Sequence, residues 1–184
     1  DFKVGACKIG VLYSHQSVDV VAERIARREI PNVVLDPIIR AKNGEELLRP
    51  PAIKRMKRNL IPKVTLITPN ALEAEALTGV EVTDEESARE AARVLVGMGA
   101  RYALVKGGHL EGEPVDILYN GSGFHELRGR RSDKNMHGTG CVLSAAIAGR
   151  LALGDGVPEA VEFAKQYVST AIERSVMLGK GRMG

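Results

Sequence analysis

Short runs rich in aliphatic and β-branched residues alternate with longer runs of helical periodicity along the whole 184-residue chain. We predict strands at four of the short runs, Lys8–Leu12, Val33–Asp36, Val64–Ile67 and Tyr102–Lys106. This alternation is typical of βαβ units around a parallel sheet. Mostly apolar strands such as these are the kind that helices cover on both faces. The sequence therefore predicts an α/β fold with a mostly parallel central sheet.

The segments between these strands have the spacing of crossover helices. Between the first two strands, apolar residues recur at helical intervals, namely Val18, Val21, Ala22, Ile25 and Ala26. A second crossover is expected between Pro50 and Leu60. We expect a third to begin at a capping box of Thr83 and Glu86 and to end at Gly99.

The pattern changes after the fourth predicted strand. The runs Val115–Tyr119 and Phe124–Arg128 flank Asn120–Gly123, which predicts an antiparallel hairpin at 115–128. Two helices are then expected, Thr139–Leu153 and Pro158 to about Ser175, with Pro158 at the first helical position.

Composition bounds the class of protein. A chain of 184 residues with 44% hydrophobic and 27% charged residues predicts a single globular domain over 1–184. The net charge of +3 is too small and too dispersed to favour nucleic acid, and no apolar run is long enough to span a membrane. Two cysteines, Cys7 and Cys141, cannot form a disulfide framework, and no signal peptide is apparent, so we expect a cytoplasmic protein.

Polar residues follow the predicted strands where each strand ends. Asp36 closes the second strand, Asn70 and Glu73 follow the third, and Lys106 and Gly108 follow the fourth. Ligands of open α/β sheets bind outside the carboxyl ends of the strands. We therefore expect these groups to face one crevice.

The sequence His137-Gly138-Thr139-Gly140-Cys141 stands immediately before a run of small and apolar residues. Glycines allow backbone N–H groups to approach a ligand, and the N-terminus of the following helix adds free donors and a positive dipole end. The segment predicts an anion hole at Gly138, Thr139 and Gly140, and it is not a Walker loop. We further expect the helix dipole and Lys106 to lower the pKa of Cys141 and make its thiolate a usable base.

Four motifs carry a resemblance to a known family. They are DPII-x-AK-x-G (36–44), LITPN-x-x-EAEALTG (66–79), VKGGH (105–109) and HGTGC-x-LSAAIA (137–148). In this order and spacing they resemble the hydroxymethylpyrimidine and phosphomethylpyrimidine kinases of thiamine biosynthesis, in the ribokinase-like superfamily. The resemblance implies transfer of the ATP γ-phosphoryl group to 4-amino-5-hydroxymethyl-2-methylpyrimidine and to its monophosphate, with Mg²⁺ as cofactor.

The resemblance also implies a role for individual residues. Cys141 matches the catalytic base, a position where most of the superfamily has aspartate, and 138–140 match the anion hole for the transferring phosphoryl group. Lys106, with Gly108 close by, matches the lysine that meets the ATP phosphates. Asn70 and Glu73 match an N-x-x-E motif that positions Mg²⁺ through water, and Asp36 an acidic residue near the metal. Val11 and Ile38, together with Cys141, match the side that binds the pyrimidine.

Compared with the family pattern, the first strands, a glycine-rich segment and a substrate flap have no counterpart in this chain. We therefore expect the chain to correspond to the C-terminal part of the family domain, with an exposed sheet edge, and to form a homo-oligomer or to pair with a partner chain that completes the sheet. Three alternatives stay open: a pyridoxal kinase-like enzyme, a non-catalytic nucleotide-binding module and a subunit of a two-chain assembly.

Several charged residues are interpreted without a catalytic role. His109 and His137 flank the expected phosphate site, but lone histidines are more often structural residues than ligands. The basic cluster Arg128, Arg130 and Arg131 is expected in a solvated loop, and the run 54–58 on a solvated helix face.

Overall fold

A computed structural model describes residues 3–41, 44–108, 114–129 and 138–176. Its strands are β1 (Cys7–Ile9), β2 (Val33–Leu35), β3 (Leu66–Ile67), β4 (Tyr102–Val105), β5 (Val115–Tyr119) and β6 (Phe124–Arg128). Its longer helices are α1 (His15–Arg28), α2 (Pro50–Arg55), α3 (Ala71–Thr78), α4 (Glu85–Gly97), α5 (Thr139–Ala152) and α6 (Val157–Glu173). Two short helical segments continue α2, the π-helical η1 (Met56–Leu60) and the 3₁₀-helical η2 (Ile61–Lys63).

Within the described residues the strands form one sheet in the order β1-β2-β3-β4-β5-β6. The pairs from β1 to β4 are parallel, and β5 and β6 are added antiparallel to them. The predicted α/β class and the predicted hairpin are therefore confirmed. In the hairpin turn, Asn120 Oδ1 accepts from the backbone N–H of Ser122 (2.9 Å) and of Gly123 (2.7 Å).

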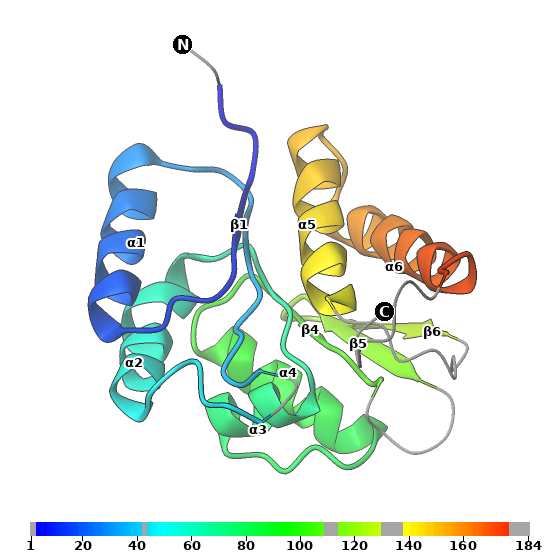
Figure 1. The fold of residues 1–184 in the computed structure, drawn as a ribbon, viewed down its shortest axis with the longest axis horizontal. Coiled ribbons are helices and arrows are strands. Elements are labelled where there is room, and N and C mark those ends of the chain that lie inside the picture. Colours follow the sequence, from blue (N-terminus) through cyan, green and yellow to red (C-terminus); the bar gives the residue numbers. More distant parts are fainter. Residues whose placement is uncertain (1–2, 42–43, 109–113, 130–137, 177–184) are drawn as a thin grey trace.

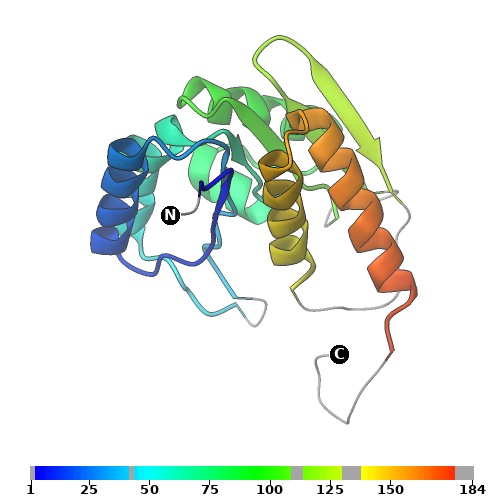
Figure 2. The same ribbon diagram turned by 90° about the horizontal axis from the view of Figure 1, so that it is seen from above.

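Helices cover the sheet on both faces, as both Figure 1 and Figure 2 show. Side chains of a strand alternate between faces, so Val33 and Leu35 join a core with α1, α2, α3 and α4, whereas Val34 joins a second core with α5 and α6. All three are essentially inaccessible to solvent. This alternation explains why the strands read as continuous apolar runs.

The strands are shorter than predicted because their last residues leave the ladder towards the crevice. β1 ends at Ile9 rather than Leu12, β2 at Leu35 rather than Asp36, and β4 at Val105 rather than Lys106. The backbone N–H groups of Asp36 and Lys106, directly after β2 and β4, still form hydrogen bonds. Asp36 N donates to Ile9 O at 2.9 Å, and Lys106 N donates to Pro69 O at 2.9 Å.

Two helix starts differ from the expectation by one residue. The capping box of α4 is formed by Asp84 and Ser87, not by Thr83 and Glu86, because Asp84 Oδ1 accepts from Ser87 N at 2.8 Å. Pro158 occupies the second position of α6, after Val157. The second crossover does form within 50–60, but its α-helical part ends at Arg55 and η1 follows.

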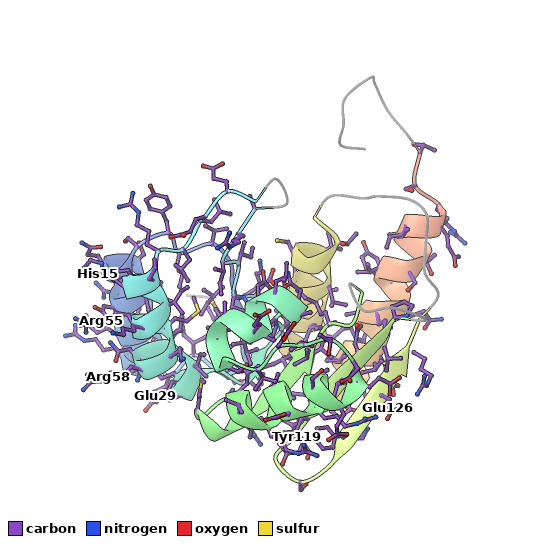
Figure 3. All side chains as sticks on the ribbon, turned by 90° about the horizontal axis from the view of Figure 1, so that it is seen from below. His15, Glu29, Arg55, Arg58, Tyr119 and Glu126 are labelled. Atoms are coloured by element: carbon purple, nitrogen blue, oxygen red, sulfur yellow. The ribbon has the colours of Figure 1, made fainter. Side chains whose placement is uncertain are left out.

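The basic run 54–58 lies on an exposed helix face, as predicted. Figure 3 shows Arg55 and Arg58 pointing away from the core on the same side as His15. Arg55 pairs with Asp19 at 3.7 Å, while Met56 between the basic residues is buried. None of the described helices is long and apolar enough to cross a membrane.

Candidate functional site

Asp36 is the buried centre of the crevice at the carboxyl ends of the strands. Its side chain is 3% exposed and has a cation on each oxygen. Lys106 Nζ lies 3.3 Å from Oδ1, and Lys8 Nζ lies 3.5 Å from Oδ2. Ser144 Oγ of α5 is also within hydrogen-bond distance of Oδ2, at 3.2 Å. A buried carboxylate needs such partners, so Asp36 holds two ammonium groups and α5 at fixed positions.

The N-terminus of α5 lies beside Lys106. Gly138 is the N-cap in the left-handed region (φ 84°), where glycine is favoured. The residue makes no side-chain cap, so the first N–H groups of α5 have no side-chain acceptor at this position. A Cβ on Gly140 would lie 3.2 Å from Lys106 Nζ. The glycine thus lets the ammonium and the positive end of the helix share one place, which suits a phosphate group.

Cys141 lies in the first turn of α5 with an exposed side chain. The expectation of a lowered pKa is wrong: partial burial of the thiol, followed by the charge of Asp36 and a hydrogen bond to it, raises the pKa of Cys141. The lysines act in the opposite direction, Lys8 more strongly than Lys106, but they do not reverse the shift. The helix dipole and Lys106 favour the thiolate, but the nearby carboxylate of Asp36, which lies far from Cys141 in the sequence, favours the thiol.

Asn70 and Glu73 form the capping box of α3, next to Lys106. Asn70 Oδ1 accepts from Glu73 N at 2.9 Å, and Asn70 N donates to Glu73 Oε2 at 2.8 Å. Asn70 also forms a parallel bridge with Lys106. Burial raises the pKa of Glu73, although Lys106 and the Asn70 N–H oppose the shift. Asp36 raises it further, which shows that the two carboxylates act on each other electrostatically.

An open cleft of about 310 Å³ extends from this point between the hairpin and α6. The sequence-predicted residues among those that line it are Asn70, Lys106, Gly108, Thr139 and Gly140. The remaining lining residues come from the hairpin and the last two helices, namely Pro114, Asp116, Gly129, Leu143, Lys165, Val168, Ser169 and Ile172. The cleft thus joins a polar end near the sheet to an apolar wall of α5 and α6.

Gly107, the residue after Lys106, has no room for a side chain. A Cβ on Gly107 would lie 2.0 Å from Val115 O, far inside contact distance. Gly107 N donates to Asp116 Oδ1 at 2.9 Å, and Asp116 Oδ2 pairs with Lys165 Nζ at 2.8 Å. Lys165 also donates to Leu127 O. These contacts fix the segment after Lys106 against the hairpin and α6.

Val11 and Ile38 do not line the cleft. Val11 is 49% exposed. Ile38 N donates to Asp36 O at 2.9 Å. A Cβ on Gly10 would lie 3.9 Å from Ile38 Cδ1, so the segment after β1 passes close to Ile38. The expected pyrimidine side and the cleft therefore meet at Asp36.

Sequence reasoning missed Lys8 and Ser144, both of which contact Asp36. A charged residue inside a strand expected to be covered on both faces, and a hydroxyl inside an apolar helical run, were the available signals. Asp116 and Lys165 carried no signal beyond their charge.

The histidines that flank the expected phosphate site and the arginines of the basic cluster have no catalytic role in our interpretation. His109, His137, Arg130 and Arg131 lie outside the described residues. Arg128 is exposed, as expected, and pairs with Glu126 at 2.8 Å and with Glu85 at 3.5 Å. Figure 3 places Glu126 on the hairpin, away from α1 and α2.

The site of this α/β protein combines a lysine, a glycine-bounded helix N-terminus and two buried carboxylates at the carboxyl edge of a mainly parallel sheet. Such a combination is typical of proteins that bind phosphoryl groups. The family model for phosphomethylpyrimidine kinase matches residues 1–184, so the chain belongs to that family.

Individual relatives agree with this assignment. The chain is 46% identical to a hydroxymethylpyrimidine/phosphomethylpyrimidine kinase of Streptomyces coelicolor, covering 98% of this chain and 67% of the relative. It is 44% identical to the thiamine biosynthesis bifunctional protein ThiED of Geobacter sulfurreducens, covering 98% of this chain and 37% of that protein. A solved ADP complex of Bacillus subtilis pyridoxal kinase superposes with a TM-score of 0.87 at 33% identity, covering 96% of this chain and 66% of the other. The chain thus spans about two thirds or less of these relatives' lengths.

Proposed function

We propose that this chain carries the phosphoryl-transfer site of a kinase that acts on 4-amino-5-hydroxymethyl-2-methylpyrimidine and on its monophosphate. The observation that carries the proposal is the meeting of Lys106, the N-terminus of α5 and Asp36 at the mouth of one cleft. Phosphoryl transfer depends mainly on positioning and on neutralising the charge of the phosphoryl oxygens, and these groups supply both.

The cleft between the hairpin and α6 is the proposed place of ATP. Its apolar wall, with Leu143, Val168 and Ile172, suits the adenosine part, and Lys106 with Gly108 lies at the end where the phosphates belong. Thr139 and Gly140 then present the N-terminus of α5 to the γ-phosphoryl group. The relatives with bound nucleotide support ATP as the donor, since one solved structure is an ADP complex.

In the transfer step the hydroxymethyl oxygen of the acceptor attacks the γ-phosphorus. The new O–P bond forms while the bond from that phosphorus to the leaving oxygen of ADP breaks. The hydroxyl proton passes to the thiolate of Cys141, which lies beside Asp36 on the acceptor side. For the monophosphate a phosphate oxygen takes the place of the hydroxymethyl oxygen, and no proton needs to move when that oxygen is already ionised.

Asp36 and Glu73 are the proposed residues for Mg²⁺. The two buried carboxylates act on each other electrostatically, and oxygen ligands are those that Mg²⁺ prefers. The described residues contain no group of three His, Cys, Asp or Glu side chains arranged to hold a metal ion. Two carboxylates therefore fit an ion that keeps most of its water and is completed by substrate phosphates. When bound, the ion would offset the negative charge of those phosphates.

The alternative acceptor is pyridoxal, because the pyridoxal kinase of Bacillus subtilis has the same fold at a TM-score of 0.87. The curated relatives at 44–46% identity are named for thiamine biosynthesis or for the pyrimidine kinase, which favours the pyrimidine. A non-catalytic nucleotide-binding module is the second alternative. It would bind ATP and form no product.

The test is ADP formation by the purified chain with ATP and Mg²⁺, in the presence of each acceptor separately. We expect turnover with the hydroxymethylpyrimidine that exceeds turnover with pyridoxal, and a Lys106→Met variant that is strongly impaired. Lys63→Met, at an exposed residue of η2, is the matched control. Preference for pyridoxal would favour the first alternative. ATP binding without product from either acceptor would favour the second.

We also infer that residues 1–184 act as one domain in the cytoplasm, and that the edge strand β1 pairs in a homo-oligomer or with a partner chain. The position of β1 at the end of the strand order supports the last point, because an edge strand presents unpaired backbone groups. The molar mass in solution, measured by light scattering, tests it.

A further inference from the structure

Lys8 is a second lysine at the centre of the site, and the nucleotide does not account for it. Its ammonium pairs with Asp36 Oδ2, whereas Lys106 pairs with Oδ1. Lys106 lines the cleft, but Lys8 does not. The single carboxylate therefore holds one ammonium on each of its two sides.

Lys8 lies close to Ile38, one of the residues that we expect to bind the acceptor. A Cβ on Gly10 would lie 2.9 Å from Lys8 Nζ and 3.9 Å from Ile38 Cδ1, so the ammonium and Ile38 both lie next to this glycine. The Lys8 side chain is 22% exposed, so its charge can reach a ligand while Asp36 fixes its place.

Lys8 is also close to the proposed base. Among the groups that oppose the raised pKa of Cys141, Lys8 acts more strongly than Lys106. The acceptor atom that receives the phosphoryl group must lie beside Cys141 if this thiol is the base. Lys8 is therefore near the reacting end of the acceptor.

The two proposed acceptors differ most in charge at this end. An alcohol is neutral, but a phosphate monoester carries nearly two negative charges and must approach the γ-phosphoryl group of ATP, which is itself anionic. Lys106 and the N-terminus of α5 are already directed to the cleft. An additional cation on the acceptor side is what a phosphorylated acceptor requires.

We propose that Lys8 binds the phosphate of the phosphorylated acceptor, so that binding of the monophosphate depends on Lys8 much more than binding of the alcohol. This inference rests on the proposed function. Lys8 is then a specificity-determining residue that distinguishes the monophosphate from the alcohol. Asp36 acts as the positioning residue for its ammonium.

The experiment compares Lys8→Met with the unchanged protein on the alcohol and on the monophosphate, each at saturating ATP. We expect kcat/KM for the monophosphate to fall about ten- to hundredfold, as for the loss of a charged hydrogen bond, mainly through KM. For the alcohol we expect KM to change by less than about threefold, while its kcat falls because Lys8 no longer opposes the raised pKa of Cys141. Lys8→Arg, which keeps the charge, should recover most of the loss.

Lys54→Met, at an exposed residue of α2, is the matched control and should change neither acceptor. Retained turnover of the alcohol by Lys8→Met shows that the variant is folded, because Asp36 keeps Lys106 and Ser144 as partners. An equal rise of KM for both acceptors, or no rise for either, would overturn the role of Lys8.

A failure of the proposed function would be visible separately. If the unchanged protein phosphorylates neither pyrimidine, calorimetric binding of the pyrimidine monophosphate without ATP still tests Lys8. Weaker binding to Lys8→Met than to the Lys54→Met control supports the inference. The same affinity for both variants contradicts it.

Discussion

At the scale of single residues, Cys141 shows how a buried neighbour changes an expectation drawn from the chain alone. The helix N-terminus and Lys106 favour a thiolate, yet burial and Asp36 favour the thiol, and they prevail. A raised pKa means that the thiolate is a small fraction near neutral pH. The group is a stronger base once ionised, but it is ionised only at higher pH.

We expect turnover of the hydroxymethylpyrimidine to rise with pH beyond the ordinary thiol pKa of 9.0, because activity follows the thiolate fraction. Cys141→Asp should move the rise to lower pH by several units, since a carboxylate ionises near pH 4. Cys141→Ser should lower kcat about a hundredfold or more and leave ATP affinity nearly unchanged. Steady-state pH profiles and ATP titrations check this. Equal, small effects of Cys141→Ser on kcat and ATP affinity would remove the thiol from its role as base.

Site residues that stand in short sequence motifs could be predicted from the sequence. Site residues that are defined only by contacts with distant parts of the chain could not. Gly140 and Lys106 stand in short motifs, and the structure brings them together. Lys8 and Ser144 meet Asp36 across 28 and 108 positions of the chain. No short-range signal encodes a contact of that separation.

At the scale of elements, the start of α3 combines a structural and an electrostatic role. The capping box supplies partners for the backbone N–H of Asn70 and Glu73. It also buries a carboxylate whose pKa is raised. Local sequence predicts a cap well but not its register. The segment Thr83–Ser87 contains two overlapping capping patterns, and α4 uses the later one, in which Asp84 is the N-cap.

Glu73→Gln separates the two roles of Glu73, because a glutamine oxygen can still accept from Asn70 N. The raised pKa means that the folded protein binds a proton more tightly than the unfolded chain. Ionisation therefore lowers stability as pH rises from the ordinary value of 4.5 through the folded pKa. We expect Glu73→Gln to gain stability over the unchanged protein between about pH 5 and about pH 8, in urea unfolding. Its turnover should fall, because a carboxylate proposed for Mg²⁺ is lost.

Glu73→Ala is the matched comparison. It loses the acceptor as well as the charge, so it should be less stable than Glu73→Gln by about 1 kcal/mol at both pH values. A stability of Glu73→Gln that follows the unchanged protein at every pH would show that the buried charge carries no cost.

At the scale of the whole molecule, one ion pair ties together parts that are far apart in the chain. Asp116 on β5 joins Lys165 on α6, and Asp116 also holds Gly107 after β4. Both side chains are mostly buried, at 13% and 16% exposure. The alternating pattern predicted the parallel sheet and the hairpin, but not this tie. Strand order and helix docking are set by contacts between faces, which periodicity alone does not specify.

We expect Asp116→Asn and Lys165→Met each to lower the free energy of unfolding by about 1–3 kcal/mol, because each leaves a mostly buried charge without its partner. The double variant should lose less than the sum of the two, with a coupling of about 1 kcal/mol or more. Urea unfolding of the three variants provides the cycle. Glu23→Gln, in the exposed pair with Arg27 on α1, is the control and should change stability little. Strict additivity of the two changes would mean that the pair does not couple β5 to α6.

The division of the site at Asp36 bears on how such a protein can diverge. The cleft is lined by residues between 70 and 172, whereas Lys8, Val11 and Ile38 belong to the first forty residues. If the proposed division of roles holds, mutations in that early segment would change which molecule is accepted and leave the lining of the cleft intact. A lineage with this architecture would then exchange one small heterocycle for another through few substitutions, whereas a new phosphate donor would require simultaneous changes in the hairpin and both final helices.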